Sequence, residues 1–252
     1  MLIEYPSPIH IPLLRQLWKT AFGDTDAFLD SFFRTAFSFD RCRCVLEENR
    51  VAAVLYWFDC SVEEEKTAYI YAVATHPDFR NRGLCRALME DTHRLLAGRG
   101  YASAVLVPQK ESLRTMYAGM GYRDMGGLDT AECTSGDTPV SLRAIGSEEF
   151  ARLRRQFLPV GGVIQENENL AFLSEQLQFY TGSGFLLAAY AEKGILHGME
   201  LLGSASAAPG IVRALNCSSG HFRIPGNTLP FAMFHPLRED ASVPAYFGFA
   251  FD

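Results

Sequence analysis

The sequence predicts an α/β protein with a mixed central sheet flanked by helices, followed by a second, smaller unit of similar pattern. Short apolar runs with a period of two alternate with segments in which apolar residues recur at spacings of three and four. Hydrophobic residues make up 48% and charged residues 21% of the chain, as in soluble globular proteins. A polar, turn-rich stretch at 129–139 divides the 252 residues. We therefore expect one domain over 1–133 and another over 138–252.

The chain is expected to open with one strand and two helices. Residues 2–5 form a short apolar run, and apolar side chains then recur at helical spacings over 13–22 and over 28–36. Gly23 is expected to end the first helix, because glycine tolerates the left-handed conformation found at helix C-termini. Asp24 is expected to cap the second helix, since its carboxylate can accept hydrogen bonds from the first free amides.

Three strands are predicted next. The apolar runs 44–48 and 51–58 are separated only by Asn49-Arg50, which favours a tight antiparallel hairpin. The run 67–75 has the alternating pattern of a strand. One of its faces carries Tyr69, Tyr71, Val73 and Thr75. The other face is mostly alanine, so a helix or a ligand can approach it closely.

A helix, a strand, a second helix and a last strand complete the first domain. Pro77 stops the preceding strand, and an amphipathic helix begins near Gly83. A strand over 102–108 and a short helix over 112–119 are then expected. The loop Gly119-Met120-Gly121-Tyr122 leads into the final strand.

The second domain repeats the opening half of the first. Ser147 is expected to cap its first helix. The predicted strands span 140–145, 184–192, 194–202, 210–216 and 246–251, and the second and third of these form a hairpin. No glycine-bearing loop with an amphipathic helix follows this hairpin. We therefore interpret the second domain as a shortened, degenerate copy of the first.

Composition argues against several classes of function. The formal charge of −6 and the pI near 5.6 are unfavourable for a nucleic-acid-binding protein. No run approaches the roughly 18 apolar residues that a membrane helix needs, and the start of the chain lacks a basic region followed by an apolar one. The six cysteines include no CxxC pair and no histidine at ligand spacing, so no metal site is expected. The prediction is a cytoplasmic protein.

The segment from Val73 to Arg86 has the chemistry of an anion-binding turn. A strand ends there, the chain turns at proline, and a helix starts after a glycine. The unpaired amides at a helix N-terminus carry the equivalent of roughly +0.5 charge, which favours a phosphate. The Lys-Ser/Thr pair of a nucleotide P-loop and the GxGxxG pattern are both missing. The segment therefore favours a diphosphate that binds without magnesium.

This segment resembles the signature of the GNAT acetyltransferase superfamily. That signature is Arg or Gln, two residues, Gly, one residue, then Gly or Ala, after a strand ending in Val-x-Pro. Here the order is Thr75-His76-Pro77 and then Arg80-Asn81-Arg82-Gly83-Leu84-Cys85, with Cys85 in place of the usual Gly or Ala. The resemblance implies acetyl-CoA as co-substrate, with the pantetheine arm along Val73 and Thr75. The implied cofactor-binding residues are Val73, Ala74, Thr75, Arg80, Asn81, Arg82, Gly83, Leu84, Cys85 and Arg86.

A second motif agrees with the first. Tyr117 followed by Gly-Met-Gly-Tyr is similar to the family's later signature of Tyr, three residues, then Gly-Phe or Gly-Tyr. By this resemblance Tyr117 is the catalytic acid, which protonates the departing thiolate. An asparagine that often precedes this tyrosine is replaced by Lys110.

The general base is not defined by the sequence. Relatives that use a carboxylate on the strand before the loop would carry it near Tyr69, which is a tyrosine here. The alternatives are water, Tyr69 or Tyr71, a glutamate among 63–65, and the C-terminal carboxylate. Of these, Tyr69 is taken as the second candidate catalytic residue.

The predicted function is the acetyl-CoA-dependent acetylation of a primary amine, carried by a small molecule or a peptide. The second domain lacks the cofactor loop, so shaping the acceptor site or burying a homodimer face are the roles left to it. The alternative is a module that senses or carries acyl-CoA without turnover. A scaffold that binds no cofactor at all would require the loop to be a coincidence.

Overall fold

The computed structural model describes residues 2–47, 50–248 and 250, which form two compact units. The first unit contains the chain up to Leu106, then Lys110–Arg123 and Phe234–Ser242. The second contains Val107–Gln109, Asp124–Met233 and the residues from Val243 onward. The division therefore differs from a single cut between 133 and 138. It falls earlier, at Arg123, and the chain returns to the first unit near its end.

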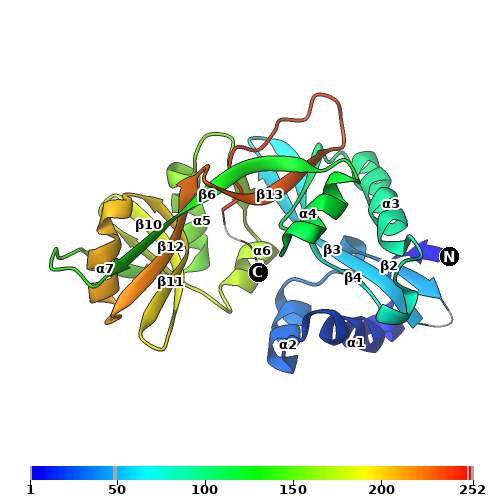
Figure 1. The fold of residues 1–252 in the computed structure, drawn as a ribbon, viewed down its shortest axis with the longest axis horizontal. Helices are drawn as coiled ribbons and strands as arrows, with labels where there is room; N and C mark the ends of the chain where they lie inside the picture. Colours follow the sequence, from blue (N-terminus) through cyan, green and yellow to red (C-terminus); the bar gives the residue numbers. More distant parts are fainter. Residues whose placement is uncertain (1, 48–49, 249, 251–252) are drawn as a thin grey trace. The chain divides into compact units, whose positions relative to one another are not determined.

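The α-helices and strands of the first unit are labelled in Figure 1 where there is room. In chain order they are β1 (Leu2–Glu4), α1 (Ile11–Phe22), α2 (Asp26–Thr35), β2 (Cys42–Glu47), β3 (Arg50–Val62), β4 (Glu65–Thr75), α3 (Leu84–Gly98), β5 (Ser103–Leu106), α4 (Glu111–Ala118) and the end of β13 (Leu229–Pro236). The strand order is β1-β2-β3-β4-β5-β13. Neighbours from β1 to β4 are antiparallel, and β4 pairs with β5 in parallel. The predicted mixed sheet is confirmed.

The β2–β3 hairpin and the β4 strand lie where the apolar runs predicted them. The hairpin pairs Glu47 with Arg50, and its turn residue Asn49 lies outside the described residues. In β4 the strict alternation of faces is wrong, because a β-bulge interrupts it. Val54 pairs with Ala74 and Tyr56 with Tyr71, so the residues between them are out of step with β3. Ala72 has a φ of 47°, a left-handed conformation unusual for alanine.

Aromatic side chains of α1, α2, β3 and β4 form the core on one face of this sheet. The Trp18 ring lies 4.7 Å from Phe32, 5.2 Å from Tyr56 and 5.7 Å from Tyr71, between ring centroids. Gly23 ends α1 with a φ of 77°, as predicted. The α2 cap is Thr25, whose Oγ1 accepts from the amide of Phe28 at 3.2 Å. The prediction that Asp24 caps this helix is therefore wrong.

The segment 234–242 completes the first unit. The Leu237 amide donates to the carbonyl of Ala102 at 2.8 Å, next to β5. Arg238 forms an ion pair with Glu65, and the Ser242 amide donates to the same carboxylate at 3.0 Å. The sequence gives no local signal for these contacts, because their partners lie more than a hundred residues away.

The second unit repeats the strand pattern of the first. Its elements are β6 (Arg123–Thr134), β7 (Leu142–Ile145), α5 (Ser147–Phe157), β8 (Val163–Gln165), α6 (Glu168–Leu173), β9 (Gln178–Gly182), β10 (Phe185–Glu192), β11 (Ile195–Gly203), α7 (Ala208–Ala214), β12 (Ser219–Gly226) and the start of β13. The strands run β7-β9-β10-β11-β12-β6-β13. Antiparallel β10 and β11 are followed by a parallel β11–β12 pair joined through α7, as β3, β4 and β5 are joined through α3.

Three predictions for this unit are wrong. Residues 210–216, predicted as a strand, lie largely in helix α7, whose first turn contains Pro209. A short apolar run does not distinguish the two structures, but proline favours a helix start. Gly146 is the N-cap of α5, and Ser147 is already helical. Tyr246 makes only an isolated bridge with Gly162, and part of the predicted last strand lies outside the described residues.

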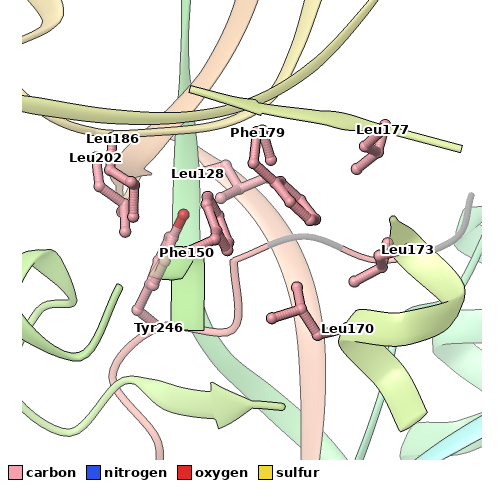
Figure 2. Packing of buried hydrophobic residues seen from close by; sticks show 10 residues of the cluster. Leu128, Phe150, Leu170, Leu173, Leu177, Phe179, Leu186, Leu202 and Tyr246 are labelled. Carbon is pink, nitrogen blue, oxygen red and sulfur yellow. The ribbon is translucent and has the colours of Figure 1, made fainter. Parts of the chain in front are cut away.

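Buried hydrophobic side chains pack on both faces of the sheet in the second unit. On one face α5, α6 and the segment around Tyr246 pack on β9 and β10, and Phe150 stacks on Phe179 at 4.2 Å (Figure 2). On the other face α7 packs through Ile211 and Val212. This unit therefore has the burial of an independent folding unit.

A buried ion pair joins α5 to β11 in the second unit. Arg154 and Glu200 make two hydrogen bonds of 2.7 and 2.9 Å, and their side chains are 3% and 0% exposed. Arg154 also donates to the carbonyls of Val163 at 2.9 Å and of Phe247 at 3.4 Å. Each partner thus compensates a charge that would be costly to bury alone.

No helix in the described part of the chain has the length and hydropathy that a membrane crossing requires. Within the same residues, no group of three or more His, Cys, Asp or Glu side chains is placed to hold a metal ion.

Candidate active site

The turn between β4 and α3 presents unpaired backbone amides in one place. The His76 amide donates to Ala52 at 2.8 Å, and a single turn, Pro77–Phe79, follows. Among the residues that the structure describes, none accepts a hydrogen bond from the amides of Asn81 to Arg86, and the first helical bond runs from Ala87 to Gly83. Asn81 and Gly83 both have positive φ, 62° and 75°. Alternating backbone conformations of this kind form the concave nests that bind anions.

Arginine side chains surround these amides, but each already has a partner. Arg80 Nε donates to the carbonyl of Thr75 at 3.2 Å. Arg82 Nη1 lies 3.5 Å from Glu47 Oε2, and Arg86 Nη1 donates to the carbonyl of Gly119 at 3.0 Å. All three arginines are exposed. The turn therefore combines a nest of amides with positive charge at its rim, as a diphosphate requires.

Strand β4 leaves an open edge beside this turn. Its parallel pairing with β5 covers Thr67, Ala68 and Tyr69, and no pair follows among the described residues. Ala74 and Thr75 pair with β3 on the opposite edge. The β5-facing edge of Val73, Ala74 and Thr75 can therefore accept an extended ligand as an added strand.

Leu84 and Cys85, in the same loop, are less exposed than the three arginines. Leu84 is 4% exposed and belongs to the core. Cys85 is half-buried, and burial raises the pKa of its thiol to about 11, so the thiol is neutral at physiological pH. Both side chains pack into the protein, so only their backbone amides face the nest.

Tyr117 lies in α4 close to Cys85. Its side chain is 6% exposed, and its ring meets Tyr122 edge-on at 5.7 Å. Burial raises the pKa of its phenol well above the ordinary value, and the neighbouring Cys85 adds to the rise. The phenol therefore stays protonated at neutral pH, as a proton donor must.

The candidate bases are in different surroundings. Tyr69 is 2% exposed and stacks on Phe58 at 5.7 Å, within the aromatic core. Glu65 is bound by Arg238 and the Ser242 amide. The C-terminal carboxylate lies outside the described residues. These contacts occupy Glu65, whereas the roles of Tyr69 and Tyr71 stay predictions.

The sequence does not predict a buried polar group that includes Tyr122, the ring that packs against Tyr117. His93 Nε2 and the Tyr122 hydroxyl are 2.8 Å apart, and the rings of His93 and His235 stack at 4.3 Å. Burial lowers the pKa of His93 to about 3, so its imidazole is neutral. In the sequence, His93 stands out only as a polar residue on the buried stripe of a helix, and no pattern singles out His235.

Replacing Gly83 by alanine tests whether the nest geometry matters. A Cβ at Gly83 would meet no atom within 4 Å, so the cost is the positive φ alone, about 1–2 kcal/mol. We expect the loop to relax and the affinity for acetyl-CoA, measured by calorimetry, to fall. Gly98→Ala is the control, because Gly98 lies in α3 with open space and no positive φ. Equal affinities in both variants would contradict the role of the nest.

The comparisons with known proteins concern the domain family and the fold. Residues 8–125 match the model of a family described as the GNAT acetyltransferase domain. No curated protein matches the sequence. A GCN5-related N-acetyltransferase from Kribbella flavida has a TM-score of 0.74 at 16% identity, with 92% of this chain and 70% of that chain covered.

Two further structures match over nearly their whole length. For a putative acetyltransferase from Pyrococcus horikoshii the TM-score is 0.64 at 12% identity, with 99% of this chain and 94% of that chain covered. For a tandem GNAT protein from the clavulanic acid biosynthesis pathway it is 0.58 at 10% identity, with 95% and 100% covered. Residues 8–125 therefore match the GNAT acetyltransferase domain family, and the fold of the chain is similar to that of a tandem GNAT protein.

Proposed function

We propose that this chain transfers an acetyl group from acetyl-CoA to a primary amine, by direct attack in a ternary complex. The observation that carries the proposal is the run of unpaired amides from Asn81 to Arg86 beside the open edge of β4. The family match supports acetyl transfer in general, and the nature of the amine is part of the proposal.

In the proposed reaction the protein positions acetyl-CoA and donates one proton to the leaving thiolate. Val73 and Thr75 bind the pantetheine arm through their backbone, and the nest holds the diphosphate. The amine nitrogen forms a bond to the thioester carbonyl carbon, and the carbon–sulfur bond then breaks. Tyr117 donates its phenolic proton to the departing thiolate, and the nitrogen loses a proton to water or a base. Tyr117 is afterwards reprotonated from solvent.

For the second unit we propose a role other than binding acetyl-CoA. The turn that leads to α7, Ser204–Ala207, contains no arginine and no glycine, and α7 has seven residues where α3 has fifteen. It therefore lacks the diphosphate nest of the first unit. Shaping the acceptor site or forming a dimer face are the roles that we propose for it.

Calorimetric titration with acetyl-CoA, followed by thiol release against a panel of amines, tests the proposal. Acetylpantetheine, which has the thiol arm without the diphosphate, is the matched ligand. We expect it to bind at least about tenfold more weakly, because charge-assisted hydrogen bonds contribute about 1.5–3 kcal/mol. Binding with turnover supports the enzyme. Binding without turnover favours the acyl-CoA sensor, and no binding rejects both.

A further inference from the structure

The turn that leads into the nest is held against the end of the β2–β3 hairpin by side chains. The Phe79 amide donates to the His76 carbonyl at 2.9 Å, and the Arg80 amide donates to the Pro77 carbonyl at 3.3 Å. These two bonds close the turn but do not connect it to the sheet. Beyond the bond from the His76 amide to β3, the position of the turn therefore depends on side-chain contacts.

Arg50, the first residue of β3, makes several of these contacts at once. Its Nη2 donates to Asp78 Oδ2 at 2.9 Å, and the same nitrogen lies 2.9 Å from His76 Nε2. Its guanidinium carbon lies 5.0 Å from the centroid of the Phe79 ring, a cation–π contact. One side chain of the hairpin thus contacts three residues of the turn.

Glu47, at the end of β2, contacts the following part of the loop. Glu47 and Arg50 are paired across the hairpin, and Glu47 Oε2 lies 3.5 Å from Arg82 Nη1. The Arg82 guanidinium also lies over the Phe79 ring, 5.1 Å from its centroid. Phe79 is 2% exposed, so its ring is a fixed support for both arginines. The end of the hairpin therefore contacts the chain just before and within the run of unpaired amides.

The pair of Arg50 and Asp78 is exposed, and its charges cancel. The two side chains are 42% and 61% exposed. The hydrogen bond from Arg50 lowers the pKa of the Asp78 carboxyl, so the carboxylate stays ionised at neutral pH. An exposed pair contributes little to overall stability, and a neutral pair adds little attraction for a diphosphate. What this pair supplies is the position of the turn.

We propose that Arg50 is a positioning residue for the diphosphate nest and acts through Asp78 and His76. This inference rests on the proposed binding of acetyl-CoA. Asn81 and Gly83, whose positive φ angles form the nest, follow the held turn directly, so a shift of the turn moves their amides. Hydrogen bonds weaken steeply when donor and acceptor are misaligned. Arg50 therefore needs no contact with the ligand.

Arg50→Gln and Asp78→Ala, alone and combined, test this role, because they break the same contact but remove opposite charges. If Arg50 acted by attracting the diphosphate, removal of the negative charge of Asp78 would strengthen binding. If it positions the loop, both changes weaken binding. Arg94→Gln is the control, since Arg94 is 73% exposed and lies about 15 Å along α3 from its start. Calorimetry measures the affinity for acetyl-CoA, and thermal melting measures the fold.

We expect each single variant to bind acetyl-CoA about tenfold more weakly than the wild type, and the double variant to bind no more weakly than the weaker single variant. Melting temperatures and the affinity of Arg94→Gln should stay near the wild-type values. Asp78→Ala that binds as tightly as the wild type, or more tightly, would overturn the inference. An equal loss of affinity in Arg94→Gln, or a loss that accompanies unfolding, would overturn it as well. Failure of the wild type to bind acetyl-CoA would instead reject the proposed function itself.

Discussion

Tyr117→Phe is expected to lower kcat by about 10²–10⁴-fold, the usual contribution of a positioned general acid. Phenylalanine keeps the ring that packs against Tyr122 at 5.7 Å, so the fold and the affinity for acetyl-CoA should be retained. Thiol release under saturating acetyl-CoA and amine measures the change. Tyr190→Phe, on a tyrosine that is 38% exposed in the second unit, is the control. A kcat within twofold of the wild type would reject the acid role.

The pH dependence provides a second readout of the same residue. Burial raises the pKa of Tyr117 above the ordinary value of 10. An acid catalyst fails once the pH exceeds its pKa, so Tyr117 should cause no decline in kcat up to pH 10. Below pH 10, the kcat of Tyr117→Phe should therefore change with pH in the same way as the kcat of the wild type. A wild-type decline centred near pH 8 that disappears in the variant would contradict the raised pKa.

Glu200→Ala is expected to have the largest effect on stability. It leaves the Arg154 guanidinium buried at 3% exposure without its carboxylate, at a cost of about 3–5 kcal/mol. Since a typical domain is stable by only about 5–15 kcal/mol, much of the margin of the second unit would be lost. Urea unfolding followed by circular dichroism measures the change. Both tryptophans, Trp18 and Trp57, lie in the first unit, so tryptophan fluorescence reports separately on that unit.

Two further variants define the origin of this effect. Glu166→Ala breaks a pair with Arg155 that has two hydrogen bonds of 2.6 Å but is solvent-exposed, and it should cost less than about 1 kcal/mol. Replacing both Arg154 and Glu200 by leucine removes both charges and should cost much less than Glu200→Ala. A similar loss in all three proteins would show that buried charge is not the cause.

Sequence patterns predicted the features that depend on neighbouring residues. The strand, turn and helix from Thr67 to Gly98 have local signals, because alternation, proline and glycine act within a few residues. The approximate extents of β10 and β11 followed for the same reason, with Lys193 and Gly194 in left-handed conformation at the turn. The unpaired amides of the nest also follow from where the helix begins.

The features that the patterns missed depend on tertiary contacts. The β-bulge at Ala72 has no glycine to indicate it. Thr25 and Asp24 are both good capping residues, and the indole of Trp18 decides which of them is the cap. Tyr122, whose ring packs against Tyr117, also contacts His235, which lies far along the chain in β13. Local sequence contains no information on such pairings.

The return of residues 234–242 to the first unit affects synthesis on the ribosome. The partner of the Ala102 carbonyl is the amide of Leu237, so the outer edge of β5 stays unpaired until the last part of the chain emerges. At typical translation rates this delay is roughly ten seconds, far longer than the folding of a small domain. During that time an exposed strand edge can pair with other nascent chains. Expression of this protein should therefore depend on chaperones, and truncation before residue 234 should yield aggregates instead of a separate catalytic domain.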